Sequence, residues 1–167
     1  MTAKERVFRV SVGAAVWAVL VVASLSLLIA LYFTYWPDRP VTDTARQSVV
    51  DAAKEGTAAV YTYSADTIDK DIASAQSHLT GDFLSQYQQY VDSPAPSDAK
   101  KNAVKTAATV VGAALMKLDP GSADVLLFIN QTTTSASNPA TTMASRSIQV
   151  TMMKVNGKWL ISSMKPV

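Results

Sequence analysis

The chain has 167 residues, one histidine, no cysteine and a formal net charge of +2. Without cysteines it can form neither disulfides nor thiolate metal sites, and its near-neutral charge argues against nucleic acid as a partner. The length allows one domain and an additional segment.

The additional segment is residues 10–36, which contain no charged side chain. Thirteen of these residues are Val, Leu, Ile or Phe. As a helix the segment would span about 40 Å, against a hydrocarbon core of about 30 Å. A cleaved signal peptide has an apolar run of only about 7–15 residues, and a core helix rarely stays uncharged for so long. We therefore expect an uncleaved transmembrane anchor, with Tyr32, Tyr35 and Trp36 at the outer headgroup level.

Flanking charge sets the expected orientation of the anchor. Three bases, Lys4, Arg6 and Arg9, precede it together with one acid, whereas Asp38 and Arg39 balance each other after it. The positive-inside rule then puts the N-terminus in the cytoplasm and the rest of the chain outside the plasma membrane. The predicted divisions are a cytoplasmic N-terminus (1–9), an anchor (10–36), a linker (37–44) and an external α+β domain (45–167).

The external part is neutral but polarised along the sequence. Residues 38–98 hold ten acids and four bases, a balance of −6, and residues 99–167 hold two acids and eight bases, a balance of +6. The split could describe two ordinary solvated surfaces, or a dipolar surface for a charged partner.

Helices are predicted between residues 45 and 91. Small or apolar residues recur every three or four positions from Ala45 to Tyr63, and Thr42 or Thr44 can cap this helix. Gly56 lies on its apolar face. Because glycine costs about 1 kcal/mol relative to alanine in a helix, we expect a close helix–sheet contact there.

Two further helices are expected before the sheet. One begins near Ser64 or Asp66, and the next begins near Asp82 after an interruption at Thr80 and Gly81. The proline- and serine-containing stretch 92–98 is predicted to be a loop.

Strands are predicted between residues 104 and 167. The Val- and Thr-rich stretch 104–118 is followed by a turn, a second strand from Val125 and a third with alternating apolar residues. Asn156-Gly157 is a strong signal for a two-residue hairpin leading into the fourth strand. The expected fold class is α+β, with helices packed on one face of a curved four-stranded antiparallel sheet.

The stretch VLLFINQTTT, residues 125–134, changes abruptly from apolar to polar. We expect Val125 to Ile129 to be covered on both faces of the sheet, because such burial removes the usual alternation. Asn130 would then mark the edge of the core, with Asn130 and Gln131 tying the strand end to a neighbouring element.

The residues offer little for catalysis or metal binding. Asp66, Asp69 and Asp71 lack the spacing and the glycine of a calcium loop, and helix N-terminal acids explain them better. His78 and a nearby serine have no orienting acid. Asn130-Gln131-Thr132 matches the glycan acceptor pattern, which is common by chance. No catalytic residue, metal or cofactor is expected.

A ligand pocket at the open end of the sheet is an alternative. Asn130, Gln131 and Thr132 could line it, since pockets combine apolar walls with a few polar groups. The aromatic walls would be Tyr61, Tyr63, Phe83, Tyr87 and Trp159. The simpler interpretation is that these aromatic residues belong to the core.

Four motifs behind the anchor occur in an order that resembles the Mce-associated membrane proteins of mycobacteria and related actinobacteria. They are Tyr61 with Tyr63; Leu79, Thr80, Gly81 and Phe83; Asn130, Gln131 and Thr132 with Thr133; and the terminal hairpin Lys154 to Leu160, with Asn156, Gly157 and Trp159. The resemblance covers nearly all of the external domain.

The resemblance implies a fold similar to the periplasmic domain of the secretion protein VirB-eight, a relative of the nuclear-transport-factor cone. It implies an accessory or stabilising subunit of an Mce lipid transporter, working through protein contacts rather than as an enzyme. The expected partners are the membrane and Mce transporter subunits. A self-associating envelope scaffold and a small-ligand-binding or lipid-binding cone are the alternatives.

Overall fold

The computed structural model describes residues 12–35 and 42–167, and the chain divides into two units, residues 1–41 and 42–167. In the first unit the described residues form helix α1 (Val12–Tyr35), of 24 residues. Within the described ranges, no helix combines the length and hydropathy that a membrane crossing needs. The anchor over 10–36 therefore stays a prediction. The predicted cytoplasmic segment 1–9 and most of the linker 37–44 lie outside the described residues.

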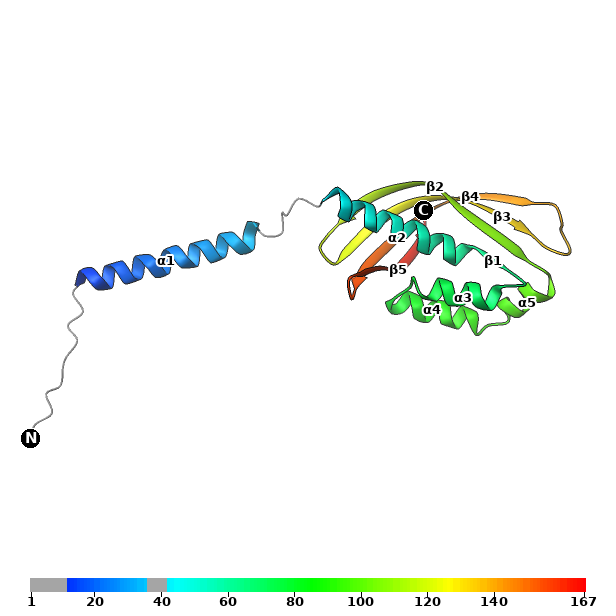
Figure 1. Ribbon diagram of the computed structural model, residues 1–167, viewed down its shortest axis with the longest axis horizontal. Helices are drawn as coiled ribbons and strands as arrows, with labels where there is room; N and C mark the ends of the chain where they lie inside the picture. The colour runs from blue at the N-terminus through cyan, green and yellow to red at the C-terminus, as the bar shows by residue number, and fades with distance from the viewer. Residues whose placement is uncertain (1–11, 36–41) are drawn as a thin grey trace, which may run out of the picture. The chain divides into compact units, whose positions relative to one another are not determined.

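The second unit is an α+β domain in which the helices come before most of the sheet. The helices are α2 (Asp43–Tyr61), α3 (Ile68–Gln76), α4 (Gly81–Val91) and α5 (Ala95–Lys101). The strands are β1 (Tyr63–Ser64), β2 (Lys105–Leu118), β3 (Ser122–Thr134), β4 (Thr142–Val155) and β5 (Lys158–Pro166). The order in the sheet is β1-β2-β3-β4-β5, and every pair is antiparallel. Within this unit, α2 runs across the curved sheet (Figure 1).

The four-stranded prediction is wrong by one short strand. Tyr63 pairs with Thr106, and Ser64 pairs with Lys105, which adds β1 at the edge of β2. A two-residue strand leaves no alternating pattern in the sequence, because its pairing partner lies about forty residues away. The predicted loop 92–98 is also wrong in part. α5 occupies Ala95–Lys101, with Asp98 in its first turn and lysines in its last, as the helix dipole favours.

Local sequence signals correctly predicted where α2 begins and where β4 turns into β5. Thr42 is the N-cap of α2, and its hydroxyl accepts a hydrogen bond from the backbone N–H of Ala45 at 3.3 Å. At the β4–β5 turn, φ is +51° at Asn156 and +84° at Gly157. Val155 pairs with Lys158 across this turn, which confirms the predicted hairpin and its register.

The core lies between α2 and the inner face of the sheet. α2 packs on β2 and β5, and α4 packs on β5. The buried cluster consists of Val49, Ala53, Leu79, Ala123, Val125, Leu127, Ile129, Ile148, Val150, Met152 and Ile161. At Gly56 an added Cβ would lie 2.8 Å from Cδ1 of Ile161 and 3.1 Å from Cβ of His78. The predicted close helix–sheet contact is therefore confirmed.

The expectation that Val125 to Ile129 are covered on both faces is wrong. Burial alternates along β3: Val125, Leu127 and Ile129 are buried, Leu126 is half-buried and Phe128 is 43% exposed. Helices cover only the inner face, so the outer face carries apolar side chains at its surface. The continuous apolar run therefore comes from one covered face and one apolar open face.

Candidate functional site

A pocket of about 310 Å³ lies where the end of α2 meets β1, α3, α4, α5 and β3. Its volume is at the lower end of the range for small-ligand sites, about 300–1,000 Å³. It is lined by Val60, Tyr61, Thr62, Tyr63, Ile68, Asp71, Ile72, Tyr87, Tyr90, Pro96 and Gln131. We call it the tyrosine pocket, since four of these residues are tyrosines.

A break in secondary structure places the first two tyrosines. α2 ends at Tyr61, and Thr62 is extended, with φ −112° and ψ 119°. The hydroxyl of Thr62 accepts a hydrogen bond from the backbone N–H of Ala108 at 3.1 Å, so the chain turns directly onto β2. Tyr63 then sits in β1, opposite Thr106. The end of α2 and the short strand β1 together bring the phenol rings of Tyr61 and Tyr63 to one pocket.

The sheet register brings Gln131 to the same place. Thr106 pairs with Thr133 on β3, and their hydroxyl oxygens are 3.4 Å apart. Because side chains alternate along a strand, Gln131 shares the face of Thr133, the one that turns toward the helices. Gln131 therefore lines the pocket that Tyr63 enters from β1.

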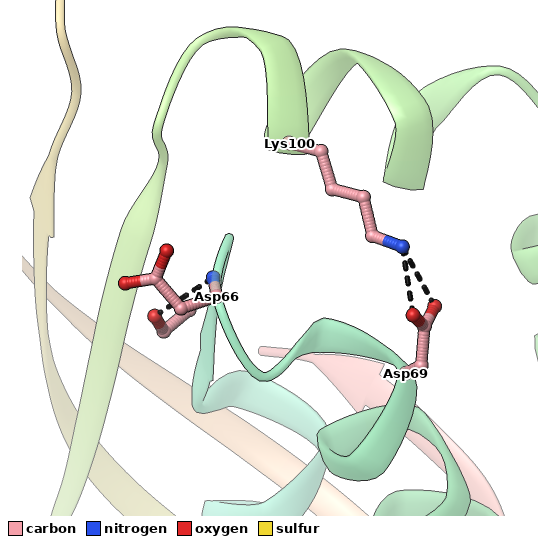
Figure 2. A network of polar contacts seen from close by, with 4 residues as sticks. Asp66, Asp69 and Lys100 are labelled. Atoms are coloured by element: carbon pink, nitrogen blue, oxygen red, sulfur yellow. Dashed lines mark hydrogen bonds and ion pairs between the residues drawn. The ribbon is translucent and has the colours of Figure 1, made fainter.

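An ion pair links two helices of the pocket wall. Lys100 of α5 donates to Asp69 of α3, with its Nζ 2.7 Å from Oδ2 and 3.0 Å from Oδ1 (Figure 2). In the same view, the backbone N–H of Asp66 donates to the hydroxyl of Ser64 at 3.3 Å. The Lys100–Asp69 pair is exposed, so it contributes under about 1 kcal/mol, but it joins the helices that carry Asp71 and Pro96.

Asp71 is the acidic group of the tyrosine pocket. Its Oδ2 accepts a hydrogen bond from the hydroxyl of Thr67 at 2.6 Å and another from the backbone N–H of Ser64 at 3.1 Å. Within the described residues, no lysine or arginine nitrogen lies within ion-pair distance of this carboxylate. The orientation of Asp71 is therefore set by uncharged donors, and its negative charge stays unpaired.

The tyrosines affect one another electrostatically. The rings of Tyr87 and Tyr90 lie 6.1 Å apart, centroid to centroid, and tilt by 42°. Burial raises the pKa of Tyr87, and the neighbouring Tyr90, Asp71 and Tyr63 raise it further. Burial also raises the pKa of Tyr61, partly offset by the charge of Arg146. The raised pKa values keep the phenols of Tyr61 and Tyr87 neutral at physiological pH.

The structure brings together only part of the pocket expected from the sequence. Tyr61, Tyr63, Tyr87 and Gln131 line one pocket. Phe83 and Trp159 pack against the core and do not line the pocket, whereas Tyr61 and Tyr87 do both. Asn130 and Thr132 point to the other face of β3. There the Asn130 Oδ1 accepts a hydrogen bond from Ser145 at 2.7 Å, and the Thr132 hydroxyl donates to the carbonyl of Ala107 at 3.4 Å.

The Leu79-Thr80-Gly81 motif joins the helical layer to β5. Leu79 is buried and forms a parallel bridge with Ile161. The N–H of Ile161 donates to the carbonyl of His78 at 2.8 Å, and the N–H of Thr80 donates to the carbonyl of Ile161 at 2.9 Å. Gly81 has φ +58°, which favours glycine, and redirects the chain into α4. These contacts give the motif a structural role.

The terminal hairpin is likewise built from packing contacts. Trp159 packs against the core on one side, and the Nζ of Lys154 lies 5.5 Å from the centroid of its ring. A lysine at this distance from an indole gains a cation–π contact. Asn156 and Gly157 form the turn described above.

Ser77 and His78 form hydrogen bonds with nearby backbone groups. The hydroxyl of Ser77 donates to the carbonyl of Ser74 at 2.6 Å, and the backbone of His78 pairs with β5. Of the residues that the structure describes, no three His, Cys, Asp or Glu side chains group as metal ligands.

The outer face of the sheet carries a second surface of interest. Exposed large apolar side chains on the three central strands are Val111 (60%), Met116 (58%), Phe128 (43%), Met143 (72%) and Met153 (46%). Phe128 covers the gap at Gly112 of the neighbouring strand, where an added Cβ would be 3.2 Å from its ring. We call these five residues the outer apolar patch.

Sequence reasoning missed Asp71 and Tyr90 as members of the pocket. Asp71 looked like an ordinary helix N-terminal acid, and Tyr90 like a packing residue of α4. The spacing of Tyr87 and Tyr90 does put both on one helix face, which was an available signal. Only the fold shows that this face meets Tyr61 and Tyr63. The arrangement can bind a small molecule between ring faces and a carboxylate.

Two proteins of Mycobacterium tuberculosis are similar to this chain. The uncharacterized protein Rv1362c is 47% identical over 133 residues, covering 80% of the chain and 60% of the relative. The outer membrane protein Rv1973 is 41% identical over 134 residues, covering 79% of the chain and 83% of the relative. The chain thus spans about 60% of the length of the first relative. No protein-family model matches the chain.

Solved structures match the fold at low sequence identity. The periplasmic domain of DotI superposes with a TM-score of 0.61 and 18% identity, covering 75% of this chain and 95% of that domain. The Agrobacterium tumefaciens VirB8 protein gives a TM-score of 0.60 and 15% identity, covering 77% and 95% respectively. The predicted VirB-eight-like fold is confirmed.

Proposed function

The chain belongs to the family of the Mycobacterium tuberculosis outer membrane protein Rv1973, and from this premise we propose that it is an envelope assembly protein. Its domain, residues 42–167, would work by binding other protein subunits rather than by catalysis. The observation that supports this most is the fold, which is that of the periplasmic domain of DotI and of VirB8. The proposal assigns no chemical step to the chain.

The proposal includes a single N-terminal anchor in the plasma membrane, with residues 45–167 on the outer side. Its support is the uncharged stretch 10–36 and the basic residues before it. The chain contains no cysteine, so single cysteines can report topology directly. Ser137→Cys, in the exposed β3–β4 loop, should react with a membrane-impermeant maleimide in intact cells, whereas Thr2→Cys should react only after lysis. Equal labelling of both variants in intact cells would refute this topology.

For the partner we favour a second copy of the chain. Residues 42–98 hold nine acids and three bases, and residues 99–167 hold two acids and eight bases. The acidic part is almost entirely helical and the basic part mainly the sheet, so the charges of two copies are complementary in a head-to-tail contact. Lys154 and Lys158 of the terminal hairpin form no ion pair within the described chain and are available to such a contact.

Co-purification of two differently tagged copies from detergent-solubilised membranes tests this contact. We expect the second copy to co-purify at low salt but not at high salt, because salt screens exposed charges. Lys154→Glu with Lys158→Glu should reduce recovery, while Lys117→Glu, whose lysine already pairs with Asp119 at 2.7 Å, serves as the matched control. If the amount of the second copy recovered changes neither with salt nor with the charge reversal at Lys154 and Lys158, this charge-based contact is excluded.

A role as an accessory subunit of an Mce lipid transporter is the second candidate. It is favoured by the four motifs that occur in the order of Mce-associated proteins: Tyr61 with Tyr63, Leu79 to Phe83, Asn130 to Thr133, and Lys154 to Leu160. Crosslinking in membranes distinguishes the two. Self-pairs alone support the scaffold, whereas crosslinks to transporter subunits without self-pairs support the accessory role.

A further inference from the structure

The tyrosine pocket is a feature on which the proposed function does not depend. It combines four phenol rings from three elements with a single carboxylate: Tyr61 from α2, Tyr63 from β1, Tyr87 and Tyr90 from α4, and Asp71 from α3. At about 310 Å³ it exceeds the roughly 30 Å³ share of one water molecule about tenfold, so it can hold a small organic molecule.

The charge of the pocket favours a cation. Ring faces of tyrosine carry negative electrostatic potential and attract ammonium groups within about 6 Å of the ring centre. Asp71 adds a full negative charge that, within the described residues, no ion pair neutralises. The apolar lining from Val60, Ile68 and Ile72 suits the methyl groups of an alkylated ammonium rather than a hydrated metal ion.

The opposing charge is Arg146, which lies on β4 opposite Ile129. It acts on Tyr61, but it is not among the residues that line the pocket. On α5, Lys100 is paired with Asp69 and Lys101 with Asp98. Among the residues that the structure describes, the pocket lining therefore contains no base, and its one formally charged side chain is Asp71.

From this combination we propose that the tyrosine pocket is a binding site for an organic cation of the quaternary ammonium class. Tyr87 and Tyr90 supply one wall and Tyr61 and Tyr63 the other. Asp71 lies in the first turn of α3, where the hydroxyl of Thr67 and the backbone N–H of Ser64 hold its carboxylate, and it faces the cationic group. Gln131 provides an uncharged amide for a polar substituent of the ligand.

The probe for this proposal is choline, compared with its neutral isostere dimethylbutanol, in which a tert-butyl group replaces trimethylammonium. The full chain in detergent is titrated with each, and saturation-transfer NMR reports on the methyl groups of the probe. We expect choline to bind about tenfold more tightly than the isostere, because only choline has the charge that the rings and Asp71 attract.

Variants separate the two sources of attraction. Asp71→Asn keeps an oxygen that can accept the bonds from Thr67 and Ser64, and should weaken choline about tenfold without affecting the isostere. Asp82→Asn is the matched control, because Asp82 also lies in the first turn of its helix but does not line the pocket. Tyr90→Leu should weaken choline severalfold and Tyr90→Phe should not, since phenylalanine retains the ring face.

Three outcomes would overturn the proposal. The isostere could bind as tightly as choline, which would make the pocket merely apolar. A fatty carboxylate could bind where choline does not, which would point to Arg146 and an anionic ligand. Choline could also bind equally well to the wild type, Asp71→Asn and Tyr90→Leu. Because Tyr90 is about half-exposed, its variants remain informative if Asp71→Asn fails to fold.

Discussion

The helix–sheet layer has two ends that are packed very differently. At the β5 end, α2 approaches so closely that Gly56 leaves no room for a Cβ beside Ile161. At the β1 end, the same helix stops at Tyr61, and the surrounding elements leave about 310 Å³ unfilled. The family-like Leu79-Thr80-Gly81 motif belongs to the first end and Tyr61 with Tyr63 to the second. Motifs that carry one resemblance thus lie partly in a close packing contact and partly in the lining of a pocket.

The largest loss of stability should come from making a cavity at the closely packed β5 end. Ile161→Ala removes a fully buried side chain that contacts Gly56 and pairs with Leu79, and should lower the free energy of unfolding by about 2–5 kcal/mol. Ile72→Ala, on the wall of the existing pocket, should cost less than half as much. Denaturant unfolding of the full chain in detergent, followed by circular dichroism, measures both. Equal losses would mean that the two ends do not differ in packing.

A smaller effect is expected from filling the close contact. Gly56→Ala gains about 1 kcal/mol of helix propensity, but the new methyl group meets Ile161 and His78, and overpacking costs about 1–3 kcal/mol. The net loss should be about 1 kcal/mol. Gly121→Ala, where nothing lies within 4 Å, is the control and should leave the melting temperature unchanged. A stabilised Gly56→Ala protein would contradict the proposed close packing.

The adjacent amides of Asn130 and Gln131 lie on opposite faces of β3, the first on the outer face of the sheet and the second in the pocket lining. Asn130→Ala removes the hydrogen bond from Ser145 and should lower the unfolding free energy by about 0.5–1 kcal/mol. Gln131→Ala enlarges a pocket that is already present and should cost less. A double-mutant cycle with Ser145→Ala should give a coupling energy for Asn130 and none for Gln131. If Asn130→Ala leaves stability intact but abolishes subunit association, Asn130 belongs to a docking site instead.

The smallest effect at neutral pH concerns Tyr87. Its pKa is raised in the folded protein, chiefly by burial, so the fold binds the phenol proton more strongly than the unfolded chain does. The stability contribution is complete below the unfolded pKa, about 10, and is lost as pH rises through the higher folded pKa. Tyr87→Phe should therefore match the wild type at pH 7 and lose less stability above pH about 10. Parallel loss in both proteins would show that Tyr87 is not the responsible group.

Features encoded by neighbouring residues were predictable. Asn156-Gly157 demands positive φ at two successive positions, and Thr42 precedes a helical period, so the hairpin and the cap could be located from sequence. The same holds for Gly56, whose place on an apolar helix face indicated the close contact. β1 could not be found this way, because its pairing with Thr106 depends on a residue about forty positions away.

The two failures in β3 and α5 have different causes. An apolar run such as Val125 to Ile129 does not distinguish two covered faces from one covered face and one open apolar face, because residue type reports hydrophobicity and not what covers it. Pro94 is the N-cap of α5 and Pro96 lies in its first turn, and two prolines so close together usually indicate a loop. Proline is tolerated in the first turn of a helix, where its missing N–H has no intrahelical partner.

By itself the sequence determined that helices precede the four long strands, where the turn at Asn156-Gly157 lies, and the polarity of charge along the chain. Periodicity, φ preference and composition are local properties, so they can be read without the fold. Only the tertiary structure decided which tyrosines meet and that Asp71 joins them. The residues that line the pocket span positions 60 to 131, and the pairing of Tyr63 with Thr106 and of Thr106 with Thr133 brings Gln131 to the tyrosines. That pairing follows from the register of distant strands, which no short stretch of sequence contains.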